Sequence, residues 1–124
     1  MLEVGVHDNF SGVVGYGLTV VEEQTHFALW AISKAPLIIG ANLNDIRDES
    51  LAIYKNSWLI AVNQDPESNQ ASCFYGCDDT DILSIYVSRG SDGCNYGVWV
   101  NWGDDELAPT SIDLGSLGII PTPS

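Results

Sequence analysis

The feature that most constrains the fold is a segment, starting at Thr19, that has a helical pattern and is apolar on nearly every side. Thr19-Val20-Val21-Glu22 matches a capping box, in which the Thr19 hydroxyl and the Glu22 carboxylate each accept a hydrogen bond from the other residue's amide. The pattern predicts a helix over 20–35, because the residue before Pro36 is disfavoured in the α region. Its apolar positions lie on both sides of the helix: Phe27, Ala28, Leu29, Trp30, Ala31 and Ile32. Such a helix needs cover on most faces.

Short apolar segments flank this predicted helix. Residues 2–5 alternate in polarity and read as the end of a strand, and residues 37–40 read as a short buried strand. Strand, helix and strand form a βαβ unit, so the first part of the chain is α/β. A lone parallel pair would leave strand edges and apolar surface in water, so this unit is expected to be part of a larger architecture, such as a barrel.

The composition changes near Pro66. Before it, Asp48 or Ser50 is expected to cap a second helix over 51–54, and a further helical turn is expected around 58–62. After it, strands are predicted at 82–88 and 96–102, joined by a polar, glycine-containing turn at 89–93, and a further strand at 111–114. We therefore divide the chain into an α/β part at 1–66 and an antiparallel β part at 67–124.

Seventeen acidic and four basic residues give a formal net charge of -13. This charge would repel nucleic acid and anionic lipid surfaces, so neither is an expected partner. No apolar run is long enough to span a bilayer. Residues 1–5 do not resemble a secretory signal, which indicates either an intracellular protein or a start that is not the natural one.

Three cysteines, Cys73, Cys77 and Cys94, are too few for a disulfide framework and lack the histidine partners of a zinc site. Cys73 and Cys77 are close enough in sequence to form a small disulfide loop, and three reduced thiols are the alternative. Asn9-Phe10-Ser11 is a glycosylation sequon, so Asn9 is a candidate for modification. We expect no metal ion and no cofactor.

Acidic, histidine and aromatic residues are the remaining site candidates. Glu22 and Glu23 lie in the first turn of a predicted helix, where the helix dipole alone explains them. The acidic clusters at 78–81 and 104–106 are typical of solvated turns and do not match a calcium-binding loop. His26 is expected to pack within the helix and His7 to lie in a surface loop. Packing also explains the aromatic residues better than a single sugar-stacking platform does: Trp58, Tyr96, Trp99 and Trp102.

Residues 18–46, LTVVEEQTHFALWAISKAPLIIGANLNDI, closely resemble the melibiase-type α-galactosidases and α-N-acetylgalactosaminidases of glycoside hydrolase family 27, in particular fungal members. The resemblance extends back to Met1-Leu2-Glu3-Val4-Gly5 and forward to the motif at 60–66. It implies a (β/α)₈ TIM barrel in which 2–5 form the seventh strand, 20–35 the seventh helix and 37–40 the eighth strand. Residues 67–124 would then begin an antiparallel β-sandwich domain.

The same resemblance implies a secreted enzyme that hydrolyses terminal α-linked galactose with retention, which requires two carboxyl groups roughly 5 Å apart. In this family both are aspartates on earlier strands, so this chain holds no catalytic residue and is expected to be inactive by itself. Met1 is the only residue that matches a substrate-pocket position. The alternative is a non-catalytic carbohydrate-binding or scaffold module derived from the same family.

Overall fold

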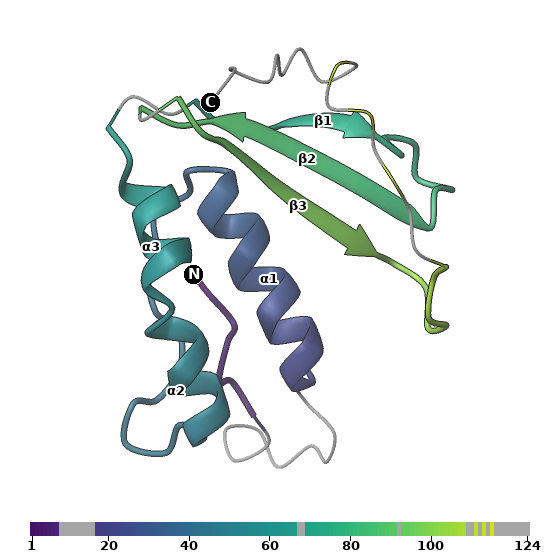
Figure 1. Cartoon of the computed structure of the whole chain (residues 1–124). Coiled ribbons are helices and arrows are strands. Elements are labelled where there is room, and N and C mark those ends of the chain that lie inside the picture. The colour runs from purple at the N-terminus through teal and green to yellow at the C-terminus, as the bar shows by residue number, and fades with distance from the viewer. Residues whose placement is uncertain are drawn as a thin grey trace.

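A computed structural model describes residues 1–7, 17–66, 69–91 and 93–108, together with 111, 113 and 115. The sequon at Asn9 and parts of the strand expected at 111–114 lie outside these residues. Helix α1 (Val20–Ile32) and the shorter helices α2 (Asp48–Tyr54) and α3 (Ser57–Gln64) precede strands β1 (Ser72–Tyr75), β2 (Leu83–Arg89) and β3 (Asn95–Asn101). Figure 1 shows α1 between the sheet and the α2–α3 pair.

Helix α1 begins as predicted, because both hydrogen bonds of the Thr19–Glu22 capping box are present. The predicted end at residue 35 was three residues too late. Lys34 adopts a left-handed backbone with a φ of 59°, and two bonds close the turn: Lys34 N to Ala31 O at 3.2 Å and Ala35 N to Trp30 O at 3.1 Å. This is the hydrogen-bond pattern of a Schellman motif, which ends the helix before Pro36 is reached.

The segments that flank α1 run parallel and meet at one bridge, between Leu2 and Ile39. Leu2 N donates to Ile38 O at 2.8 Å, and Gly40 N donates to Leu2 O at 3.0 Å. The two expected strands are therefore paired, but each is a single-residue bridge within the described part of the chain. The first is cut short by a turn at Gly5, whose φ of +77° favours glycine.

The core lies where this N-terminal segment packs between α1 and the α2–α3 pair. Leu2, Val4, Phe27 and Ile53 are buried together, and the rings of Phe27 and Tyr54 form a T-shaped pair with centroids 5.7 Å apart. The expectation that Asp48 or Ser50 caps α2 was wrong, because the N-cap is Arg47, which makes no side-chain capping bond. Ser50 is instead fully buried. Its hydroxyl donates to the Glu23 carboxylate rather than to an amide of α2.

The second half forms an antiparallel sheet in the order β1-β2-β3. The β2–β3 hairpin confirms the prediction with ends shifted by one residue, and Val100 is buried while Trp99 faces away, as alternation required. Strand β1 was not predicted. It is short and mostly exposed, so it carries little apolar periodicity, and its register with β2 is interrupted after Cys73.

Several bonds cross the position of Pro66 and join the sheet to the helices. Ala71 N donates to Ile32 O at 3.1 Å, and the amide and hydroxyl of Ser91 both donate to the Asp65 carboxylate, at 2.9 and 3.1 Å. The helical part and the sheet are thus hydrogen-bonded to each other near the end of α1.

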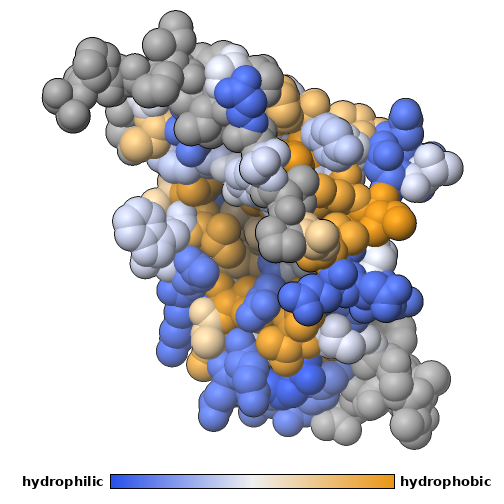
Figure 2. Space-filling view, turned by 45° about the vertical axis from the view of Figure 1, so that its right-hand side comes forward, coloured by the Kyte–Doolittle hydropathy of each residue, from blue (hydrophilic) through white to orange (hydrophobic). Residues whose placement is uncertain are grey.

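Large apolar side chains also reach the surface, and hydrophobic residues gather across the middle of the face drawn in Figure 2. Trp58 is the most exposed of them at 83%. Four others lie in the N-terminal segment, in the segment that pairs with it or in the loop that follows: Met1, Ile38, Ile39 and Leu43. Among the described residues, no helix is both long and apolar enough to cross a membrane.

Candidate functional site

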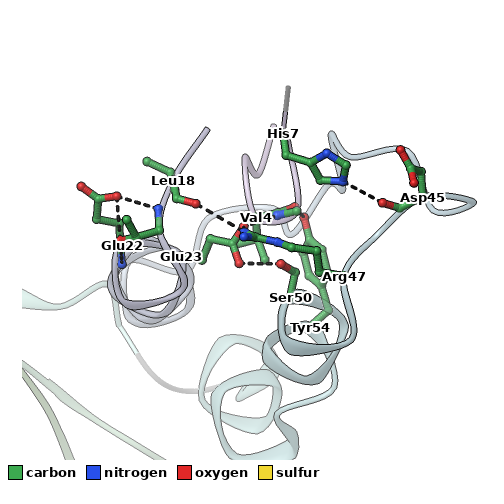
Figure 3. A network of polar contacts seen from close by, with 11 residues as sticks. Val4, His7, Leu18, Glu22, Glu23, Asp45, Arg47, Ser50 and Tyr54 are labelled. Atoms are coloured by element: carbon green, nitrogen blue, oxygen red, sulfur yellow. Dashed lines mark hydrogen bonds and ion pairs between the residues drawn. The ribbon is translucent and has the colours of Figure 1, made fainter. Parts of the chain in front are cut away.

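A buried carboxylate, that of Glu23, is the centre of the most connected group of polar contacts among the described residues. Its side chain has no exposed surface. Three donors reach it: Gly5 N at 2.8 Å, Arg47 Nη2 at 2.9 Å and Ser50 Oγ at 2.6 Å. Figure 3 shows Arg47 and Ser50 beside the Glu23 side chain. We call Glu23, Gly5, Arg47 and Ser50 the Glu23 network.

Each member of the network is placed by a local feature of the chain. Glu23 lies in the first turn of α1, Gly5 lies at the turn that ends the first extended segment, and Arg47 and Ser50 begin α2. Because Gly5 and the start of α2 follow the two parallel segments, the network lies at the carboxyl ends of both. A buried anion is tolerable here because it is paired and its oxygens accept hydrogen bonds.

Two further contacts link the loops at this end. His7 Nε2 lies 2.7 Å from the backbone oxygen of Asp45, and Arg47 Nη2 also donates to Leu18 O at 3.4 Å. These bonds connect three segments: the residues just after the first extended segment, the residues just before α1 and the loop that leads to α2 (Figure 3).

Tyr54 connects the network to the core, because its hydroxyl donates to Val4 O at 2.8 Å. Burial, with a smaller contribution from the nearby Glu23 charge, raises the pKa of Tyr54 to about 12. In contrast, the Thr19 backbone amide and then its hydroxyl lower the pKa of Glu22, because both donate to the carboxylate. Both residues thus keep the ionisation state that their hydrogen bonds require near neutral pH.

The Glu23 network is not suited to acid–base chemistry. A general base must be free to take a proton from a substrate, whereas Glu23 is buried and accepts bonds from three protein donors. Glu22 is occupied by the capping box. The helix dipole was therefore a sufficient explanation for Glu22, but it missed the role of Glu23. The spacing along the helix indicates that Glu23 points inward, because it lies on the same helix face as Phe27 and Trp30, at i+4 and i+7.

The remaining polar candidates do not converge on a site in the described residues. His26 is a packing residue, as expected: its Nε2 accepts from Glu3 N at 3.2 Å and its ring lies 5.5 Å from that of Trp30. Burial lowers the pKa of His26; the nearby Glu3 charge has a smaller opposite effect, and the N-terminal amine lowers the pKa slightly further. No group of three His, Cys, Asp or Glu side chains suited to a metal ion occurs in the part of the chain that the structure describes.

The tryptophans lie on different surfaces. Trp99 and Trp102 are about half exposed, at 51% and 53%, and Trp58 is on α3. Trp102 Nε1 donates to Ser84 Oγ at 2.8 Å, which fixes its ring beside the sheet. None of the three is buried by the described part of this chain, so packing against the rest of a barrel stays a prediction.

The structure confirms the predicted disulfide between Cys73 and Cys77. Cys73 and Cys77 are bonded, with Cα atoms 5.9 Å apart, and Cys94 is exposed in the hairpin turn. The bond closes the loop between β1 and the approach to β2. Met1, the candidate substrate contact, is 75% exposed at the start of the first extended segment.

Comparison with known proteins identifies the family. The family model described as alpha galactosidase A matches residues 6–65. Alpha-galactosidase D of Emericella nidulans is 38% identical over 102 residues, which are 82% of this chain and 15% of that protein. Alpha-galactosidase A of Aspergillus niger is 45% identical over 74 residues, or 60% of this chain and 14% of that protein.

Solved structures agree with the sequence matches. The α-galactosidase of Saccharomyces cerevisiae, solved with raffinose, matches 81% of this chain at 32% identity with a TM-score of 0.58, over 22% of its own length. The resemblance is thus to glycoside hydrolases. The chain belongs to the melibiase family of α-galactosidases, and its relatives in this family include fungal enzymes. It spans 13 to 15% of the length of the first curated relatives it matches.

Proposed function

We propose that this chain is the closing segment of an α-galactosidase that removes terminal α-linked galactose from oligosaccharides and glycoconjugates with retention. The observation that carries the proposal is the match to α-galactosidases over both the helical part and the sheet, at 82% of the chain for the relative from Emericella nidulans. The solved yeast relative, whose structure includes raffinose, supports a galactoside as substrate.

In this proposal residues 1–66 complete a (β/α)₈ barrel and residues 67–124 begin an antiparallel β-sandwich. The parallel bridge between Leu2 and Ile39, with α1 connecting the two segments, supports a βαβ unit of such a barrel. Exposed apolar side chains on the paired segments, including Ile38 and Ile39, are what neighbouring barrel elements would cover. The antiparallel β1-β2-β3 sheet supports the second domain.

The catalytic nucleophile and the acid/base, both aspartates, are assigned to residues outside this chain. This is supported by the Glu23 network, in which the one buried carboxylate of α1 is already saturated with donors. Met1 remains the proposed substrate contact. Retaining hydrolysis by two carboxyl groups needs no metal ion or cofactor.

An assay with a chromogenic α-galactoside tests this assignment. The 124-residue chain is expected to be inactive, and the complete polypeptide that carries it is expected to release galactose first as the α-anomer, seen by proton NMR. Substantial turnover by the pure 124-residue chain would overturn the assignment of the catalytic groups. A complete polypeptide that leaves α-galactosides intact would refute the proposed function.

A non-catalytic carbohydrate-binding or scaffold module is the second candidate. A groove of about 600 Å³ between α1 and the end of β3 favours it, because Asn101, Trp102 and Asp104 line one wall. An aromatic face beside amide and carboxylate groups is suited to a sugar ring. Calorimetric titration of the 124-residue chain with galactose separates the two, since saturable binding supports the module.

The parent protein is proposed to be secreted. The Cys73–Cys77 disulfide supports this, because disulfides persist mainly in oxidising compartments. Glycosylation at Asn9 follows from the same proposal, and a mass increase removed by an endoglycosidase would test it in the secreted protein.

A further inference from the structure

We propose that Glu23 is a positioning residue for the substrate side of the barrel, a role that rests on the proposed function. The buried Glu23 carboxylate is bonded to three protein donors, so its role is to position them. It connects the carboxyl ends of two parallel segments to the start of α1, and in a barrel these ends carry the active-site loops.

The geometry makes Glu23 the shared anchor of both ends. On one side it accepts from Gly5 N at 2.8 Å, at the turn where the chain leaves the first extended segment. On the other side it accepts from Arg47 and Ser50, at the start of the helix that follows the second segment. Neither end can shift relative to the other without breaking a bond to the same carboxylate.

The surrounding contacts strengthen this coupling. Arg47 also donates to Leu18 O, and His7 lies against the Asp45 backbone oxygen at 2.7 Å. Tyr54 also fixes the position of Val4, because its hydroxyl donates to the Val4 carbonyl. Loss of the Glu23 carboxylate would leave the buried Gly5 amide without its acceptor and Arg47 without its carboxylate partner. Both groups would then shift locally to form other hydrogen bonds.

Small displacements at a substrate-facing loop have large kinetic effects, because catalysis depends on sub-ångström alignment of reacting groups. We therefore expect Glu23→Ala in the complete enzyme to lower kcat about 10- to 100-fold while KM changes less. Glu23→Gln retains an acceptor for the Gly5 amide and is expected to recover part of the loss. Glu22→Gln is the matched control, since Glu22 lies in the same helical turn but is exposed and serves only the cap.

The kinetic test separates positioning from simple destabilisation. All variants are assayed at a temperature where circular dichroism shows them folded, and rates are expressed per folded molecule. A loss in kcat that exceeds the loss of folded protein, with recovery by Glu23→Gln, supports positioning. Unchanged kcat in folded Glu23→Ala enzyme would overturn it.

Amide hydrogen exchange in the 124-residue chain provides a test that does not depend on activity. Glu23→Ala is expected to speed exchange at Gly5 by at least tenfold and also at residues 45–47, whereas Glu22→Gln leaves both protected. If exchange at 45–47 is unchanged, Glu23 does not couple the two ends and the inference fails. If the complete polypeptide lacks α-galactosidase activity, the proposed function fails, and the exchange result still decides the coupling.

Discussion

Tyr54 belongs both to the apolar core and to the polar contacts around Glu23. Its ring packs on Phe27, and its hydroxyl donates to the Val4 carbonyl at 2.8 Å. Both the apolar surroundings and the nearby anion disfavour a charged phenolate. The neutral form is therefore part of the folded structure, which gives this single residue a pH-dependent effect on stability.

The stability of the chain should decrease as the pH rises from about 10 to about 12. The pKa of Tyr54 is raised from 10.0 to about 12 in the fold, so its contribution is complete below the unfolded value and is lost above it. Tyr54→Phe should remove this part of the pH dependence and one late-ionising tyrosine from a spectrophotometric titration. An unchanged number of late-ionising tyrosines in Tyr54→Phe would contradict the assignment.

At the scale of elements, α2 and α3 are short helices whose start points are set differently. Helix α2 has no side-chain cap, and its first turn is held by the bonds of Arg47 and Ser50 to Glu23. Helix α3 has a local cap, because Asn56 Oδ1 accepts from Trp58 N at 3.1 Å and Leu59 N at 3.2 Å. The start of α3 is thus determined locally, whereas that of α2 depends on tertiary contacts.

Asn56→Ala should lower the free energy of unfolding by about 1 kcal/mol, the usual effect of losing an N-cap. The two freed amides lie at an exposed position, so water would satisfy them in part. Urea unfolding followed by circular dichroism measures the change. Ser57→Ala, one residue further along the same helix, is the control and should leave stability nearly unchanged.

At the scale of the whole molecule, Lys34 joins the helices near the junction with the sheet. It ends α1 in a left-handed conformation, and its ammonium group donates to Val62 O at 2.8 Å and Asp65 O at 2.7 Å, which lie at the end of α3. Asp65 in turn accepts from Ser91 in the β2–β3 turn. A left-handed lysine is strained by roughly 1–2 kcal/mol, and these charged bonds offset that cost.

Lys34→Met should lower the free energy of unfolding by about 2 kcal/mol, because it keeps the strained backbone and removes both bonds. Lys34→Gly should be about 1 kcal/mol less damaging, since glycine adopts the left-handed conformation without strain. Denaturant unfolding of both variants measures the difference. Lys55→Met, at an exposed lysine after α2, is the control, and equal losses at positions 34 and 55 would refute the role of Lys34.

Local patterns predicted the start of α1, the β2–β3 hairpin and the orientation of Trp99, because capping and alternation act over a few residues. The same reasoning gave the wrong end for α1 and the wrong cap for α2. The left-handed turn at Lys34 is held by α3, about 30 residues further along the chain, and Ser50 turns inward to Glu23. No neighbouring residue in the sequence carries that information.

The amino-acid sequence by itself determined the family, the helix that begins at the Thr19–Glu22 capping box and the antiparallel character of the second half. These follow from motif identity and short-range periodicity. Only the tertiary structure decided which donors the Glu23 carboxylate meets and that it connects three segments. Its donors lie 18 to 27 residues away in the chain, so their meeting depends on how α1, α2 and the first extended segment pack together.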